Sequence, residues 1–105
     1  MIRSLYSGVS GIQNFQREMD VIGNNIANVN TTGFKSARVD FSDAFSQTLR
    51  GSTGANGTSS GVAAIQIGSG VTTSAIRNIY TQGGLVGTGV QTDLGVSGEG
   101  FFIVR

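Results

Sequence analysis

The stretch MIRSLYSGVSGIQNFQREMDVIGNNIANV, residues 1 to 29, decides the fold because it carries an unbroken repeat of apolar positions. The repeat alternates steps of four and three residues, and one member is a glycine: Met1, Leu5, Gly8, Ile12, Phe15, Met19, Ile22, Ile26 and Val29. Such a heptad repeat predicts a helix of the coiled-coil type, which packs against other helices along this row. We call the positions from Leu5 to Val29 the apolar stripe and expect them to form an assembly interface.

The predicted helix runs from Ser4, a suitable N-cap, to Asn28, and is about 37 Å long at about 1.5 Å per residue. Its glycines weaken it, since each costs about 1 kcal/mol relative to alanine. Either the helix packs loosely on its own domain, or it becomes stable when other helices approach closely over the glycines. The rest of the chain offers no second long apolar stripe, so we expect the partner to be another chain or a segment beyond these residues. Polar residues occupy the opposite, solvent-facing positions: Arg3, Ser10, Arg17 and Asn24.

The composition excludes several classes of protein. The 105 residues allow at most one small domain, and a net charge of +1 gives no electrostatic footprint for nucleic acid or an anionic membrane. The chain has no Cys and no His, so we expect neither a disulfide framework nor a metal site of the usual kind. It also lacks an apolar run of about 18 residues that could span a membrane. We expect no cleavable signal sequence, because Arg3 is followed by glycines and polar residues in place of a continuous apolar stretch.

The helix leads into an asparagine-rich segment, GNNIANVNTTGFK, residues 23 to 35. Asparagine competes for backbone hydrogen bonds and tolerates left-handed conformations, so the segment is typical of a helix end, with Asn30 or Gly33 as the terminating residue. The carboxamides of Asn24, Asn25 and Asn28 could also bond across to neighbouring helices and fix their register. The two interpretations are compatible. The following turn then places Phe34 at the exit of the helix.

The segment from residue 31 to 80 is predicted to be an extended, glycine-rich connector. A short helix over residues 41 to 49 would be capped by Asp40 and present Phe41, Phe45 and Leu49 on one face. Residues 51 to 61, GSTGANGTSSG, are of low complexity and predict a linker or flexible loop. Strands are predicted over residues 62 to 67 and 71 to 80, with a turn at 68 to 70.

Residues 81 to 105 are predicted to begin a β domain. A hairpin with its turn at residues 98 to 100 would end in the apolar strand Phe101 to Val104. Because this strand stands at the end of the sequence, we expect the chain to be the N-terminal piece of a longer subunit. The predicted fold class is thus an α+β fragment: a long N-terminal heptad helix, a glycine-rich connector and short strands with a hairpin.

No catalytic constellation is found. A Ser-His-Asp arrangement is impossible without His, and Lys35 is the only lysine. The glycine-rich stretches at residues 68 to 70 and 95 to 100 neither match a P-loop nor open a helix. We therefore expect a protein that is not an enzyme and needs no cofactor.

Several motifs together resemble the flagellar axial proteins, the family of rod, hook and related subunits. They are MIRSLYSGVSGI, DVIGNNIANVNTTGFK, QIGSGV, TQGGL and DLGVSGEGFFIV, in that order along the chain. The resemblance covers most of the sequence, least of all residues 51 to 61. Its signature residues are Gly23, Asn24, Asn25, Asn28, Asn30, Thr31, Gly33, Phe34 and Lys35. Within the family, the residues of the opening motif and of DVIGNNIANVNTTGFK are most similar to those of hook subunits, and distal rod subunits are the alternative.

The resemblance implies a structural subunit of the bacterial flagellum, exported by the flagellar type III apparatus without a cleaved signal. Residues 1 to 30 would belong to an inner helical layer, residues 31 to 80 would connect the layers, and residues 81 to 105 would enter an outer β domain. The implied partners are copies of the chain, related rod, hook and junction proteins, the C-terminal helix of the full-length subunit, the export apparatus and the hook cap. A hook subunit would help to pass torque from rod to filament.

A hypothesis from another class is an amphipathic helix that docks on a membrane or serves as an adaptor. The low number of basic residues argues against docking on a membrane, because Arg3 and Arg17 are the only cations of the helix. Cosedimentation with vesicles at low salt distinguishes the two hypotheses, since strong binding would favour the amphipathic module.

A peptide of residues 1 to 30 is expected to be largely unfolded in dilute solution, because its glycines oppose helix formation and its apolar stripe has no partner. Circular dichroism measures this directly. A stably helical monomeric peptide would contradict the prediction.

Overall fold

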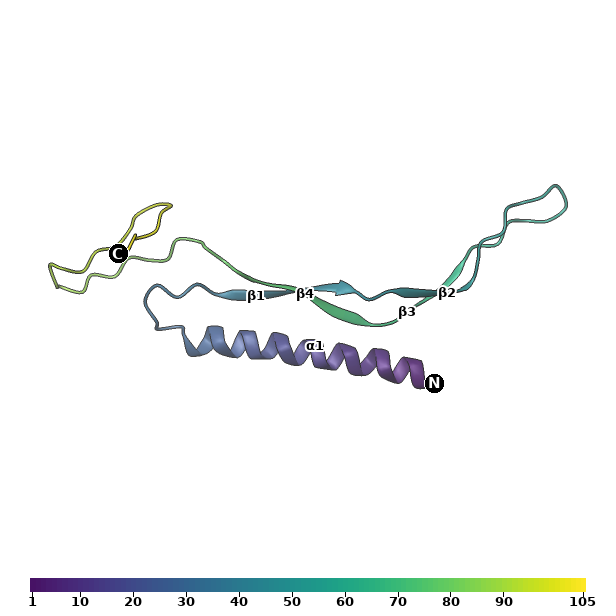
Figure 1. Ribbon diagram of the computed structural model, residues 1–105, viewed down its shortest axis with the longest axis horizontal. Helices are drawn as coiled ribbons and strands as arrows, with labels where there is room; N and C mark the ends of the chain where they lie inside the picture. The colour runs from purple at the N-terminus through teal and green to yellow at the C-terminus, as the bar shows by residue number, and fades with distance from the viewer.

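The computed structural model describes all residues from 1 to 105 and consists of one long helix lying along an extended two-stranded ribbon (Figure 1). The molecule is elongated, with principal extents of 83 × 32 × 26 Å. The ribbon reaches beyond the N-terminal end of the helix, and the last segment of the chain lies beyond its other end (Figure 1). The α+β fold class predicted from the sequence is confirmed.

Helix α1 spans Ile2–Ala27, close to the predicted extent. The N-cap prediction is wrong: the helix begins before Ser4, whose hydroxyl instead donates to the Met1 carbonyl at 2.7 Å. The helix also ends before Asn30 and Gly33, because Asn28 leaves the helical conformation while its amide still bonds to the Asn24 carbonyl. Gly33 does adopt the left-handed conformation expected of it, with φ of 76° in the turn that follows.

Four strands follow the helix: β1 (Ala37–Asp43), β2 (Ser46–Arg50), β3 (Ile65–Gly68) and β4 (Val71–Asn78). β1 pairs with β4 and β2 pairs with β3, both in antiparallel fashion. Two backbone hydrogen bonds bridge the gap between the pairs, from the Ala44 amide to the Gly70 carbonyl and from the Ser69 amide to the Phe45 carbonyl. The four strands therefore form one continuous ribbon. The two strands predicted after residue 61 are confirmed, with shifted ends.

The helix predicted over residues 41 to 49 is wrong, because these residues lie in β1, β2 and the short link between them. The four-residue spacing of Phe41, Phe45 and Leu49 fits a helix locally. The distant strands β3 and β4, however, pair with this segment in antiparallel fashion, with register shifts between Asp40 and Phe41 and between Thr48 and Arg50. Asp40 does not cap a helix either, since its carboxylate pairs with Arg38 and Arg77 on the ribbon.

The low-complexity tract of residues 51 to 61 forms the tip of the β2–β3 hairpin, with isolated bridges between Thr53 and Val62 and between Asn56 and Ser59. The hairpin predicted near residues 98 to 100 is not formed, because residues 81 to 105 contain no strand. That segment is instead held by an edge-to-face contact of Tyr80 with Phe101, with ring centroids 6.1 Å apart.

The structure contains no hydrophobic core. No apolar side chain is buried, and the single buried residue is Asn14, which is 5% exposed. Helix and ribbon do touch through aromatic rings, since Phe15 of α1 meets Phe41 of β1 edge to face at 5.8 Å between centroids. Their association therefore rests on a few apolar contacts and on polar groups.

Gly70 joins the two halves of the ribbon and lies against the helix, so a Gly70→Ala variant is expected to loosen that contact. Its φ of 112° disfavours any side chain, and an added Cβ would lie 2.2 Å from the Ser10 hydroxyl oxygen. We expect a loss of roughly 1–3 kcal/mol in the free energy of unfolding, measured by urea denaturation. Gly68→Ala is the matched control, because its Cβ would meet Asp43 at an ordinary 3.8 Å. Equal losses in the two variants would contradict the prediction.

Candidate functional site

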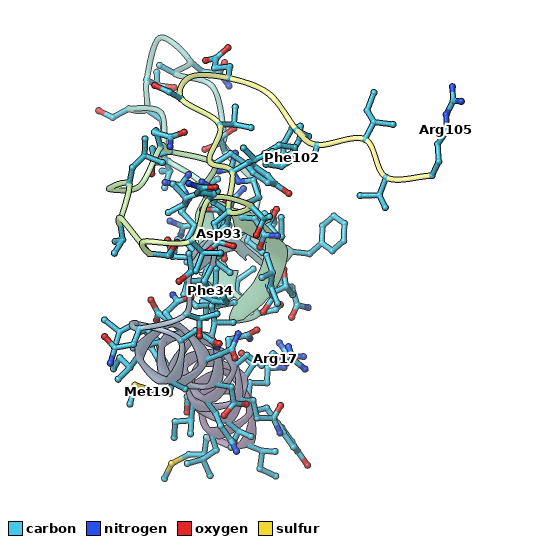
Figure 2. All side chains as sticks on the ribbon, turned by 90° about the vertical axis from the view of Figure 1, so that its left-hand side faces the viewer. Arg17, Met19, Phe34, Asp93, Phe102 and Arg105 are labelled. Carbon is cyan, nitrogen blue, oxygen red and sulfur yellow. The ribbon has the colours of Figure 1, made fainter.

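The apolar stripe lies uncovered along α1. Its large side chains are between 40% and 76% exposed: Leu5, Ile12, Phe15, Met19, Ile22, Ile26 and Val29. Figure 2, which looks from one end of the molecule, shows Met19 and Arg17 on opposite flanks of the helix. A row of this many exposed apolar residues marks a surface for association. The structure thus gathers the predicted interface residues on one side of the helix and leaves them open.

The exposed apolar surface is wider in the first half of the helix than in the second. Ile2, Tyr6 and Val9 stand beside the stripe there and are themselves exposed. In the second half, the positions with the same spacing are polar or small: Gln13, Gln16, Asp20 and Gly23. The first half can therefore contact a broader apolar partner surface.

The glycines of the helix are not explained by contacts within this chain. An added Cβ at Gly8 or at Gly23 would meet no atom within 4 Å. Gly8 belongs to the apolar stripe, where the missing side chain leaves room for another backbone to approach closely. Packing of the helix on its own ribbon does not require that room.

A different side of α1 holds the ribbon, and its central residue is Asn14. The Asn14 amide nitrogen donates to the Val71 carbonyl at 2.6 Å and to the Ser10 carbonyl at 2.7 Å. Its oxygen accepts from the Thr73 hydroxyl at 2.7 Å and from the Arg17 guanidinium at 3.1 Å. Both donors and both acceptor sites of the carboxamide are thereby used, which is what burial of such a group requires.

Asn25 makes the second polar connection, three turns further along the helix. Its amide nitrogen donates to the Ala37 carbonyl at 2.7 Å, and its oxygen accepts from the Ala37 amide at 3.0 Å. At the other end of the β1–β4 pair, the Ser10 hydroxyl accepts from the Val71 amide at 3.3 Å. Helix side chains thus satisfy both backbone groups of Ala37 and both backbone groups of Val71.

The remaining signature residues organise the exit from the helix. Asn28 donates to the carbonyl and to the side chain of Asn24, and it accepts from the Thr31 hydroxyl. The Lys35 ammonium donates to the Thr81 carbonyl at 2.9 Å and so ties the entry into β1 to the exit from β4. Phe34 is half-buried and Asn30 is exposed. Asn25 therefore bonds to the chain's own ribbon, whereas the sequence suggested a neighbouring helix.

One of the positions predicted to face solvent does not do so, because Ser10 is half-buried against the ribbon. Arg3 and Arg17 are exposed but engage Gln47 and Asn14 respectively. The sequence analysis missed the ribbon-facing row because the heptad repeat was traced through the apolar positions only. The signal was present as a second heptad row of mostly small or polar residues: Ser7, Gly11, Asn14, Glu18, Val21, Asn25 and Asn28.

The ionisable groups form no constellation suited to acid–base or metal chemistry. Asp40 lies between Arg38, at 3.3 Å, and Arg77, on the face of the ribbon. No group of three or more His, Cys, Asp or Glu residues gathers closely enough to hold a metal ion. The structure also has no helix that combines the length and the apolar character needed to cross a membrane.

Comparison with known proteins points to the flagellum. A family model described as flagella basal body rod protein matches residues 5–35, which hold most of the stripe and the asparagine-rich segment. Over all 105 residues the chain is 51% identical to the flagellar hook protein FlgE of Treponema pallidum and 52% identical to that of Borreliella burgdorferi. Over 102 residues it is 50% identical to the flagellar basal-body rod protein FlgG of Bacillus subtilis.

The chain spans only part of these relatives. The matched region makes up 23% and 24% of the two hook proteins and 39% of the rod protein, while it covers 97% or more of this chain. The similarity therefore concerns the helix, the ribbon and the segment that follows them.

Serine variants of the stripe, Ile12→Ser and Ile26→Ser, are expected to leave the fold of the chain intact. Both side chains are largely exposed, so the free energy of unfolding is expected to change by no more than about 0.5 kcal/mol. Phe41→Ser is the contrasting variant, because it removes the contact with Phe15, which is worth about 0.5–1.5 kcal/mol beyond burial. Urea denaturation compares the three. Stripe variants as destabilised as Phe41→Ser would show that the stripe serves internal packing.

Proposed function

We propose that the chain is a member of the flagellar rod and hook proteins to which it is similar, and that it is a structural subunit that polymerises through α1 into the tubular axis of the flagellum. The observation that carries the proposal is the apolar stripe, which the chain's own ribbon leaves open. The polar row of α1 forms its hydrogen bonds with the chain's own ribbon, whereas most of its apolar row is exposed. Such a helix is suited to pack into a layer of helices. In this function the chain acts mechanically, without catalysis or a cofactor.

The stripe has two classes of partner in this proposal. The first is a helix from the remainder of the full-length subunit, in particular a C-terminal helix, since the hook relatives are about four times as long as the matched region. The second is α1 of neighbouring copies and of related axial proteins. The broad apolar surface around Ile2, Tyr6 and Val9 supports contacts with more than one helix near the N-terminus. Gly8 supports close approach at that point.

Within the axis we assign the chain to the hook, the joint that passes torque from the rod to the filament. The identities of 51% and 52% to two hook proteins, over every residue of the chain, support this assignment. A subunit of the distal rod is the second candidate, and it is supported by the 50% identity to a rod protein and by the rod family match. Both assignments use the same helix interface.

The assignment to the flagellar axis carries further proposals. The subunit would leave the cell through the flagellar export apparatus without cleavage of its N-terminus, and would add to the growing structure beneath the hook cap. Residues 1 to 30 would lie in the inner helical layer, residues 31 to 80 would connect to the outer layer, and residues 81 to 105 would begin an outer β domain. The uncovered apolar residues Phe101 to Val104 support the last of these.

The test is a charged residue in the stripe of the full-length subunit, Ile22→Asp or Ile26→Asp. Burying an unpaired carboxylate between helices costs several kcal/mol, so polymer formation is expected to be abolished while the monomer keeps its fold. Electron microscopy and sedimentation of the polymer give the readout. The matched control is Gln13→Asp, an exposed residue of the same helix that lies outside the stripe.

Two results would contradict the proposal. One is normal polymer from either stripe variant. The other is strong cosedimentation of the wild-type subunit with anionic vesicles at low salt, since this would favour the amphipathic membrane or adaptor module.

A further inference from the structure

The position of the ribbon along α1 cannot be fixed by a hydrophobic core, because the structure has none, so other contacts must fix it. Register between packed elements is normally set by burying one hydrophobic face, and it is weakly set in polar, glycine-rich strands. Here no apolar side chain is buried, and β4 is rich in Thr and Ser. Apolar contacts alone would therefore tolerate a ribbon shifted along the helix.

Two carboxamides contact the ribbon at opposite ends of the β1–β4 pair. Asn14 meets Val71, the first residue of β4, and Asn25 meets Ala37, the first residue of β1. The backbone groups of these two residues point away from the partner strand, because cross-strand bonds are made by their neighbours, Gly70 with Ala44 and Ser36 with Ile79. Each carboxamide thus occupies an outward-facing edge of the ribbon, where a strand would otherwise be unpaired.

We propose that Asn14 and Asn25 are positioning residues that set the register of the ribbon on α1. Buried polar groups serve this purpose in coiled coils, where a single Asn selects one register at a cost in stability. In this structure the selection acts between a helix and a ribbon. Asn14 bonds to Ser10 and Arg17 within the helix, which leaves one donor and one acceptor site for Val71 and Thr73 of the ribbon in the observed register.

A shifted ribbon would lose these bonds. If the ribbon slipped along α1 by one residue, neighbouring residues would face the two carboxamides, and their backbone groups point toward the partner strand. If it slipped by two residues, it would move by about 6.8 Å, which corresponds to four to five residues of the helix. A slip toward the C-terminal end of α1 would bring Val71 to Glu18, whose carboxylate cannot donate to a carbonyl, and Ala37 to Val29. The opposite slip would bring Ala37 to Val21, which has no polar atom in its side chain. Neither slip satisfies both ends.

The two residues also determine which side of the helix stays open. Each stands directly before a member of the apolar stripe, Asn14 before Phe15 and Asn25 before Ile26. Successive helix residues are turned by about 100°, so the ribbon is held to one flank, where it touches the stripe at Phe15 and leaves most of the stripe exposed. This inference concerns the folded subunit and holds whether or not the stripe mediates polymerisation.

The experiment uses pairs of engineered cysteines in the full-length subunit, in which any native Cys outside residues 1–105 is first replaced by Ser. Phe15→Cys is combined with Phe41→Cys, which reports the observed register, or with Val39→Cys or Asp43→Cys, which report slips of two residues either way. A short thiol crosslinker then measures the yield of each pair. With both asparagines present, the pair with Phe41→Cys is expected to dominate.

In an Asn14→Leu, Asn25→Ala background, the preference for the observed register is expected to fall about tenfold, the factor that corresponds to 1.4 kcal/mol. Circular dichroism should show that α1 stays helical, because leucine at position 14 keeps apolar contact with the ribbon. Asn24→Ala is the matched control, since its carboxamide bonds only within the helix end, and it should leave the preference unchanged.

An unchanged preference in the doubly substituted background would overturn the inference. So would its failure to fold, because Asn14 and Asn25 would then be needed for stability and not for register. Asn25→Asp provides an independent measurement, because it keeps an acceptor for the Ala37 amide but presents no donor to the Ala37 carbonyl. We expect it to lower the preference and to speed hydrogen exchange at Ala37, and no change in either would also overturn the inference.

Discussion

The structure depends on the division of one helix into a polar row and an apolar row. Directional hydrogen bonds can be satisfied by a thin two-stranded ribbon, because each needs only one well-placed backbone group. Burying large apolar side chains needs area, and a ribbon with few large residues cannot supply it. The chain accordingly uses Asn14 and Asn25 to hold its own ribbon and leaves Ile12, Met19 and Ile26 exposed. Elongation of the molecule and the lack of a core follow from this division.

Local patterns predicted the parts of the fold that are determined locally. The heptad repeat gave α1 to within two residues at each end, because a stripe sustained over 29 residues has no strand counterpart. The turn at Gly33 followed from the conformational freedom of glycine. The segment from 41 to 49 could not be predicted in this way, since its partners β3 and β4 lie about 20 to 30 residues later and their ladders override a local four-residue spacing.

The candidate site was predicted in part. The stripe was expected to be exposed because the chain contains no second long apolar stripe that could cover it, and its side chains are exposed in the structure. The second row and the neighbouring Ser10 were missed, because Asn14, Asn25 and Ser10 carry no hydropathy signal and their role depends on backbone groups of distant strands. The asparagine-rich segment did stand out by composition. Its chemistry was anticipated as carboxamide bonding, but the partner of Asn25 turned out to be a strand edge.

The way in which helix side chains meet the ribbon has a consequence for solubility. A two-stranded ribbon has two open edges, and open edges invite strands of other molecules to pair with them and aggregate. Asn25 covers the edge of β1 at Ala37, and Ser10 with Asn14 covers the edge of β4 at Val71. Further along, the charges of Arg38, Asp40 and Arg77 discourage close stacking of ribbons. The helix thus covers these strand edges at Ala37 and Val71, and so hinders the pairing of a foreign strand at both places.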